Sequence, residues 1–311
     1  MKIMYFDDYQ LGVVKEDRVV NVMAALGPLA QKEPQERMKA LILHFDTLRP
    51  QLEKAAAQGP GIPLSEVRIR PPLPHPATID CMAVNYMEDG TRTSPAPINA
   101  FHKAPGAIIG HGDTMVLPDV PALVFEGEAE LALVISKKTN NVKAADAMNH
   151  IFGYLCFIDG SARGLPPTGN TFFQMKSRDT FAPIGPYIVT ADEIADPHQL
   201  KIQLWVNGVL KQNFNSSDMA HKIPRCIEWL SSIHTLEAGD IVATGTNHRG
   251  LNAFQDGDEV QLAVEHCGVL KIKVRDELKR TWARETRLER QEKKLDGLTP
   301  QLTGRYAKPQ E

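Results

Sequence analysis

The segment 128–135, Glu-Ala-Glu-Leu-Ala-Leu-Val-Ile, alternates in the way that a β-strand does and constrains the fold more than any other stretch. Glu128 and Glu130 fall on one face of this predicted strand, about 7 Å apart along it from two residues of rise. Strands are poor in Glu, and like charges on one face repel each other. A cation held between the two carboxylates would remove that repulsion.

A second apolar segment, 152–159, ends in a lone acid, Asp159. If this segment pairs near the first, Glu128, Glu130 and Asp159 form an all-oxygen site. Three carboxylates with open coordination positions suit Mg²⁺ or Mn²⁺, with Ca²⁺ as the alternative, better than Zn²⁺. The pattern is equally compatible with a solvated sheet edge that carries the two Glu residues and a turn that Asp159 opens.

The composition narrows the class of protein. The chain has 311 residues, a net charge of −3 and 42% hydrophobic residues, which is typical of a soluble globular protein of one large or two modest domains. We find no basic patch that indicates nucleic-acid binding and no apolar run of membrane-spanning length. The first residues lack the features of a signal peptide, and the four scattered cysteines favour reduced, buried thiols, so we expect a cytoplasmic protein.

Three regions are expected along the chain. Residues 1–70 predict a small N-terminal α+β domain, with strands near 2–6, 11–14 and 18–22 and a helical pattern over 33–58 that Pro50 should divide into two helices. The prolines of 71–76 indicate an extended linker. Residues 71–280 predict a strand-rich main domain, and 281–311 a charged tail that is helical at first and frayed at its end.

Within the main domain, residues typical of turns mark where the predicted strands begin and end. Asn207-Gly208 indicates a hairpin between 200–206 and 209–214, and Cys267-Gly268 a second one between 259–265 and 269–274. Residues 224–233 predict a helix with proline in its first turn. The stretches 85–99 and 160–175 have no apolar period and are expected to be irregular, and loops of this kind are where sites tend to be built.

Several segments form an ordered set of motifs along the chain: Glu128-Ala129-Glu130-Leu131-Ala132, Gly153-Tyr154 through Asp159-Gly160-Ser161-Ala162-Arg163, Lys176-Ser177 with Asp179-Thr180-Phe181 and Pro183, Val206-Asn207-Gly208, Ser217-Asp218-Met219, and Gly239-Asp240 through Thr244-Gly245-Thr246. With these motifs the sequence resembles the fumarylacetoacetate hydrolase family over roughly residues 75–275. The resemblance implies an α+β fold, a mixed β-roll with flanking helices. It also implies a homodimer and a divalent metal on the three acids.

The resemblance also implies a class of chemistry. Members of this family cleave, hydrate, isomerise or decarboxylate 2-oxo and 1,3-diketo acids through an enolate, which a metal stabilises as a Lewis acid. Lys176 resembles the family residue that adds positive charge near the substrate. Gly245 and Thr246 resemble its donors to the bound acid.

Two departures from the family pattern concern the general base. Hydrolases of the family usually carry a His in the loop after Asn-Tyr, paired with a nearby Glu, whereas Asp89 and Arg92 stand at or near those positions. The family often has Pro after Gly-Thr, whereas this chain has Asn-His. His248 is therefore a candidate base, because His titrates near neutral pH, and Glu88 or Asp89 is the alternative if burial raises its pKa.

Two further residues have open roles. Arg163 either binds a substrate carboxylate or braces the segment around Asp159, and Tyr86 either bonds to substrate or packs beneath it. We expect a metal-dependent hydrolase of C–C bonds in a small 2-oxo or 1,3-diketo acid. A decarboxylase or isomerase, or a keto-acid binder without turnover, is the alternative.

Overall fold

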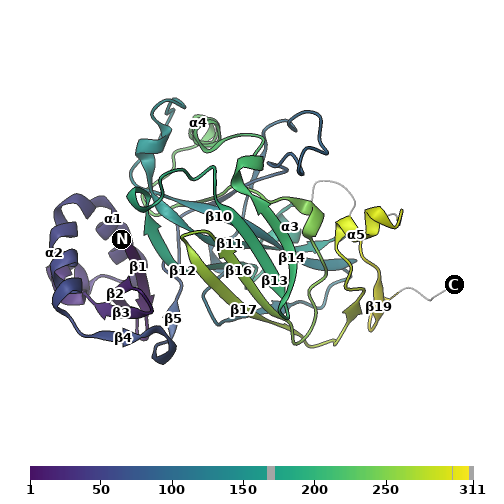
Figure 1. Cartoon of the computed structure of the whole chain (residues 1–311), viewed down its shortest axis with the longest axis horizontal. Helices are drawn as coiled ribbons and strands as arrows, with labels where there is room; N and C mark the ends of the chain where they lie inside the picture. The colour runs from purple at the N-terminus through teal and green to yellow at the C-terminus, as the bar shows by residue number, and fades with distance from the viewer. Residues whose placement is uncertain (167–171, 296, 308–311) are drawn as a thin grey trace.

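The computed structural model describes residues 1–166, 172–295 and 297–307, and it combines helices and strands as expected for an α+β protein (Figure 1). Most strands join one sheet in the order β4-β3-β2-β1-β12-β11-β10-β15-β6-β7, with β5 and β8 attached at β1 and β12. The strands of this sheet are β1 (Lys2–Phe6), β2 (Gln10–Lys15), β3 (Arg18–Asn21), β4 (Gly61–Pro63), β5 (Ile69–Arg70), β6 (Ile79–Met82), β7 (Ala100–His102), β8 (Ile108–Ile109), β10 (Val124–Ile135), β11 (Ile151–Arg163), β12 (Ala182–Thr190) and β15 (Ile241–Ala243).

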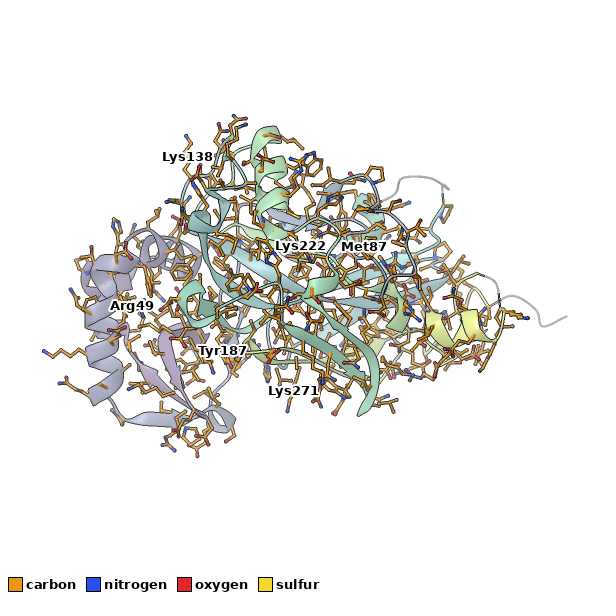
Figure 2. All side chains as sticks on the ribbon, turned by 45° about the horizontal axis from the view of Figure 1, so that its top comes forward. Arg49, Met87, Lys138, Tyr187, Lys222 and Lys271 are labelled. Carbon is orange, nitrogen blue, oxygen red and sulfur yellow. The ribbon has the colours of Figure 1, made fainter. Side chains whose placement is uncertain are left out.

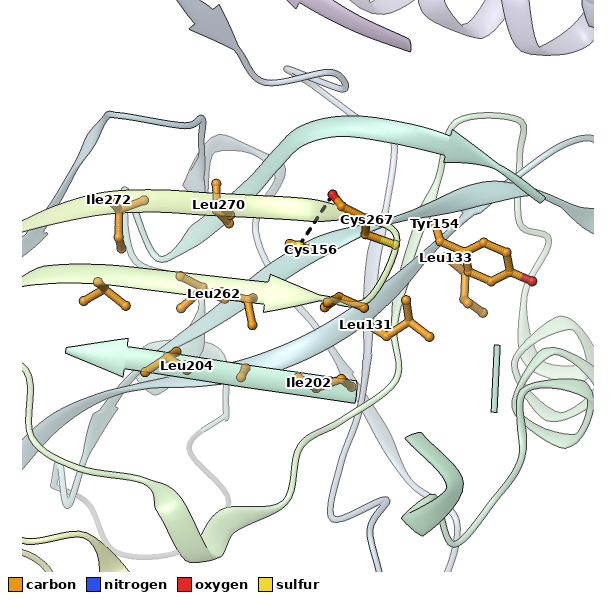
Figure 3. Close-up of a cluster of buried hydrophobic side chains, with 14 of the residues drawn as sticks. Leu131, Leu133, Tyr154, Cys156, Ile202, Leu204, Leu262, Cys267, Leu270 and Ile272 are labelled. Carbon is orange, nitrogen blue, oxygen red and sulfur yellow. Dashed lines mark hydrogen bonds between the residues drawn. The ribbon is translucent and has the colours of Figure 1, made fainter. Parts of the chain in front are cut away.

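A five-stranded sheet in the order β14-β13-β16-β17-β9 packs against the middle of the large sheet. Its strands are β9 (Thr114–Leu117), β13 (Lys201–Val206), β14 (Val209–Asn215), β16 (Glu259–Val264) and β17 (Gly268–Asp276). Figure 3 shows the interface, where Leu131 and Leu133 of β10 face Ile202, Leu204 and Leu262. Burial of these apolar side chains on both sheets drives the two layers together.

The N-terminal region forms the lobe at the left of Figure 1, with β1–β4 and the helices α1 (Pro34–Leu43) and α2 (Phe45–Gln58). The strand predictions are confirmed, but the predicted break at Pro50 is wrong: the helices separate at His44, and Pro50 lies within α2. Pro50 is the sixth residue of α2, and because it lacks an N–H it removes one helical hydrogen bond without ending the helix. The strand β1 pairs with β12 and so joins the strands of this lobe to the rest of the large sheet. The domain boundary predicted after residue 70 remains a prediction.

Both predicted hairpins and the predicted helix are confirmed. Asn207 and Gly208 have φ values of 51° and 77° between β13 and β14, as a tight primed turn requires. The strands β16 and β17 pair on either side of Cys267. The helix α4 (Ile223–Ile233) begins with proline in its first turn.

The prediction of irregular structure over 160–175 is confirmed at 164–166 but wrong at 160–163 and 172–175, and residues 167–171 lie outside the described residues. The strand β11 continues to Arg163, and α3 (Phe172–Lys176) follows the gap. The strand gains this length because β10 pairs with it along its whole course, which no local pattern reveals. The tail contains the short helix α5 (Arg287–Glu292), as predicted, but also a small two-stranded sheet of β18 (Thr281–Trp282) and β19 (Gln301–Thr303).

Arg49, Lys138 and Lys271 lie on well-separated parts of the molecule in Figure 2. Among the described residues, no helix combines the length and apolar character needed to cross a membrane.

Candidate active site

The three predicted acids meet in the centre of the large sheet. Glu128 of β10 lies directly opposite Asp159 of β11 in the antiparallel register, and Glu130 follows on the same face. One oxygen from each carboxylate lies within 4.8 Å of one from each of the others. All three side chains are buried and β10 is flanked by strands on both sides, so the alternative of a solvated edge is wrong, as is the alternative of a turn opened by Asp159.

Two buried lysines form ion pairs with two of these three acids. Lys176, the last residue of α3, donates to Glu128 Oε1 at 2.7 Å and to Asp159 Oδ2 at 2.5 Å. Lys103, which follows β7, donates to Asp159 Oδ1 at 2.5 Å and to the Gly160 carbonyl at 3.1 Å. Lys103 is not among the predicted site residues, because nothing in the local sequence indicates that the loop before Lys103 returns to the centre of the sheet.

The acids of the cluster differ in their electrostatic environment. Burial raises the pKa of Glu130 well above its usual value, and the nearby Asp159 and Glu128 carboxylates raise it further. Burial also opposes ionisation of Glu128, but Lys176 and Arg163 outweigh it and hold the pKa of this carboxyl below its usual value. Burial works against the Lys176 ammonium too, yet its two carboxylate partners keep its pKa raised.

This donor set fits a hard divalent cation. The three groups offer only oxygen, and the repulsion that raises the pKa of Glu130 is the kind of interaction that a bound dication would reverse. The backbone N–H of Gly245 already donates to Glu130 Oε2 at 2.7 Å, which orients this carboxylate.

Arg163 forms ion pairs with two acids of its own sheet. Its guanidinium donates to Glu126 and to Glu128, and Arg287 of α5 donates to Glu126 at 2.6 Å. The two arginines outweigh the effect of burial and hold the pKa of Glu126 below its usual value. These contacts support the bracing role for Arg163. Glu126 was missed, although it continues the alternation of Glu128 and Glu130.

The loop after β15 is held against β10 by a buried glutamine. Thr246 donates from Oγ1 to the Ala129 carbonyl at 2.7 Å. Gln212 of β14 donates to Thr246 Oγ1 at 2.9 Å and to the Asn247 carbonyl at 2.8 Å, and accepts from the Ala129 N–H at 3.0 Å. Gln212 thereby fixes the position of the Gly245–Thr246 backbone, a role that sequence spacing does not reveal.

Two of the candidate bases, predicted separately, lie in contact. His248 Nδ1 is 2.6 Å from Glu88 Oε1, and the His248 backbone N–H donates to the other oxygen of the same carboxylate at 2.9 Å. Asp89, in contrast, is half exposed and pairs with Arg249 at 3.1 Å. The chain thus brings a Glu and a His together from positions other than those of the family pattern.

Tyr86 is fully buried beneath this loop. Its ring packs edge to face on Phe214 with centroids 5.1 Å apart, and burial raises the pKa of its hydroxyl. These contacts support the packing role that the sequence left open.

A surface cleft of about 400 Å³ lies next to the Glu88–His248 pair. Its lining residues are Val84, Glu88, Thr91, Arg92, His248, Arg249, Arg287, Leu288 and Gln291. His248 is among the groups that lower the pKa of Glu128, so the cleft and the acid cluster lie within electrostatic reach of each other.

Comparisons with known proteins agree with this picture. The family model described as Fumarylacetoacetate (FAA) hydrolase C-terminal matches residues 78–275. Maleylpyruvate hydrolase of Aquipseudomonas alcaligenes is 32% identical over 291 residues, covering 88% of this chain and 99% of the relative. The mitochondrial oxaloacetate tautomerase FAHD2A of Homo sapiens is 39% identical over 232 residues, covering 70% of this chain and 73% of the relative.

Solved structures give the same result. Maleylpyruvate hydrolase from Sphingobium sp. SYK-6, in complex with manganese(II) and pyruvate, superposes with a TM-score of 0.81 at 35% identity, over 89% of this chain and 99% of that one. The 5-carboxymethyl-2-hydroxymuconate delta-isomerase from Mycobacterium smegmatis superposes with a TM-score of 0.71 at 28% identity, over 89% of this chain and 99% of that one. These likenesses confirm the predicted fold class. The family model matches more than half of this chain, and a relative above 30% identity covers most of it. The chain therefore belongs to the fumarylacetoacetate hydrolase family.

Proposed function

We propose that this protein is a divalent-metal-dependent hydrolase of a C–C bond in a small 2-oxo or 1,3-diketo acid. The observation that carries the proposal is the convergence of Glu128, Glu130 and Asp159 on one buried point. The maleylpyruvate hydrolases that match this chain almost from end to end support the reaction type, and the manganese in one of them supports the metal.

A divalent cation held by these three carboxylates would supply a Lewis acid for the keto and carboxylate oxygens of the substrate. Charges from the chain complete the site. Ion pairs join three carboxylates, Glu126, Glu128 and Asp159, to four cations, Lys103, Lys176, Arg163 and Arg287. A fourth carboxylate, Glu130, lies beside Glu128 and Asp159. These charges formally balance, so a dication adds two positive charges to the site, which favours a dianionic substrate.

The Glu88–His248 pair is suited to activate water. The carboxylate fixes the imidazole through Nδ1, which leaves Nε2 to take a proton from water as its oxygen attacks the carbonyl carbon. When the C–C bond breaks, its electron pair remains on a carbon of the 2-oxo acid fragment, and this carbon receives the proton that His248 took from water. The Lys176 ammonium, buried beside Glu128 and Asp159, adds positive charge where negative charge develops.

An isomerase or tautomerase is the second candidate, because relatives with those names match this chain at 28–39% identity. It needs the same acids and a base that moves a proton between carbon and oxygen, but no water. A non-catalytic keto-acid binder is the third reading.

One assay separates the three. The protein is mixed with an acylpyruvate and Mn²⁺ or Mg²⁺, and the ultraviolet absorbance of the diketo acid is followed while the products are identified. Two carboxylic acids support hydrolysis, one isomeric acid supports isomerisation, and binding with no change in absorbance supports the binder.

The base is tested by substitution. We expect His248→Ala and Glu88→Gln to lower kcat by roughly 10²–10⁴-fold, with a double variant no slower than the worse single one, because the pair acts as a unit. His150, which bonds to Thr139 at 2.8 Å, provides a matched control: His150→Ala should turn over normally. Unchanged rates in His248→Ala would reject the role of this pair.

A further inference from the structure

A second group of metal-ligating side chains lies at the outer edge of the large sheet. Asp80 of β6, His102 of β7 and His234 at the end of α4 each offer one ligand atom, and these atoms lie within 4.8 Å of one another. His102 Nδ1 is 2.8 Å from Asp80 Oδ1, and His234 Nε2 is 3.0 Å from Asp80 Oδ2. None of the three belongs to the acid cluster or to the Glu88–His248 pair.

The fold builds this arrangement from three separate elements. Asp80 and His102 are directly opposite each other in the antiparallel pairing of β6 with β7. His234 follows the last turn of α4, where the carbonyl end of the helix carries a partial negative charge. Asp80 is only 2% exposed, whereas the His102 side chain is 65% exposed, so the group is anchored inside and open to solvent on one side.

The hydrogen bonding of His234 indicates what the group is suited to hold. Its Nδ1 is 3.1 Å from the Thr235 carbonyl, an acceptor that requires the proton on Nδ1. In a neutral imidazole the lone pair of Nε2 then points at the Asp80 carboxylate, and two acceptors face each other. Either a second proton or a cation resolves this conflict, and a backbone carbonyl that fixes the tautomer is the usual support for a histidine metal ligand.

The surrounding charge favours a cation. Asp80 is buried, and the nearby Asp240 carboxylate adds further negative charge. The Asp240 carboxylate is held in place by the backbone N–H groups of Thr78 and Glu237.

We propose that Asp80, His102 and His234 form a second metal site, selective for a borderline transition-metal ion such as Zn²⁺. Two imidazoles and one carboxylate with an open position suit Zn²⁺, whereas the all-oxygen cluster suits a harder ion. The bound ion ties β7, a three-residue strand at the sheet edge, to β6 and α4. Because Lys103 follows His102 and donates to Asp159, the ion also anchors the chain just before a residue of the active site.

The test measures Zn²⁺ binding by equilibrium dialysis in excess Mg²⁺, with X-ray absorption to detect imidazole ligands. His102→Ala and His234→Ala are compared with wild type and with His266→Ala. His266 is a matched control, because its side chain is 60% exposed and its nearest acid is Glu265 at 3.9 Å.

We expect wild type and His266→Ala to bind one more Zn²⁺ per chain than the two site variants, with imidazole scattering. Loss of a direct ligand should weaken binding by more than the roughly 10–100-fold that outer partners cause. Zn²⁺ should also raise the Tm of wild type more than that of His102→Ala. Equal stoichiometry and affinity in wild type and His102→Ala, or bound Zn²⁺ without imidazole scattering, would overturn the proposal and leave a hydrogen-bonded imidazolium–carboxylate group.

Discussion

Replacement of Lys176 by Met separates the two roles that positive charge has in the acid cluster. Lys176 is buried and bonds to both Glu128 and Asp159, so its removal leaves two buried carboxylates short of a cation. At an effective dielectric constant of about 20, two unit charges 4 Å apart interact by about 4 kcal/mol. Breaking a buried pair costs about 3–5 kcal/mol, so we expect Lys176→Met to lower the free energy of unfolding of the metal-free protein by that amount.

A bound dication should replace the missing ammonium. The variant should therefore bind Mg²⁺ or Mn²⁺ more tightly than wild type, since recovery of only about 1.4 kcal/mol of the lost energy makes the affinity tenfold higher. Its turnover should fall by about 10²–10³-fold, because the positive charge near the developing negative charge is gone. Tighter metal binding together with slower turnover is the expected pattern.

Calorimetric titration with Mn²⁺, thermal unfolding with and without metal, and the absorbance assay measure these three quantities. Lys222 is the control, because its ammonium donates to the Ser217 carbonyl at 2.6 Å rather than to a carboxylate, and Figure 2 labels it. Lys222→Met should change none of the three. If metal affinity and turnover fall together in Lys176→Met, Lys176 supports the metal site instead of competing with the ion, and the electrostatic reasoning is wrong.

Three further predictions concern packing and burial. A Cβ on Gly153 would lie 2.2 Å from a backbone carbonyl of the neighbouring strand. Gly153→Ala should therefore lower the free energy of unfolding, measured with denaturant, by roughly 1–3 kcal/mol or more. Gly106 has open space around it, so Gly106→Ala should leave the free energy of unfolding unchanged. Gln212→Leu should reduce kcat/KM by about tenfold or more while the protein stays folded, because the loop it holds loses its anchor; normal kinetics would contradict that positioning role. Burial raises the pKa of Cys156 and Cys226 to about 12, so their thiolates form only at strongly alkaline pH; the native protein should resist thiol reagents near neutral pH and react at all four cysteines once denatured.

Some predictions from the sequence stay untested. The domain boundaries, a cytoplasmic location and a homodimer are of this kind, as are the identity of the ion and the assignment of individual residues to catalysis. The cleft beside Glu88 and His248 is lined by segments far apart in the chain.

The periodic pattern of the sequence determined much of this protein by itself. The alternation from Glu128 to Ile135 was sufficient to predict a strand with two acids on one face, because the side-chain period of a strand is two residues. Asn207-Gly208 was sufficient to predict its hairpin, since a positive φ at both positions restricts the residues allowed there. The ordered motifs were sufficient to indicate the family.

Only the tertiary structure decided which distant residues meet. Lys103 reaches Asp159 across 56 positions and Glu88 reaches His248 across 160. Such contacts depend on strand register and loop course, to which local propensity is blind. The register of β6 with β7 put Asp80 beside His102, and the strand order buried the acids between strands instead of at an edge. Charges brought together in a buried place interact strongly, because little water remains to screen them, and this is why the chemistry of the site follows from the fold as much as from the motif.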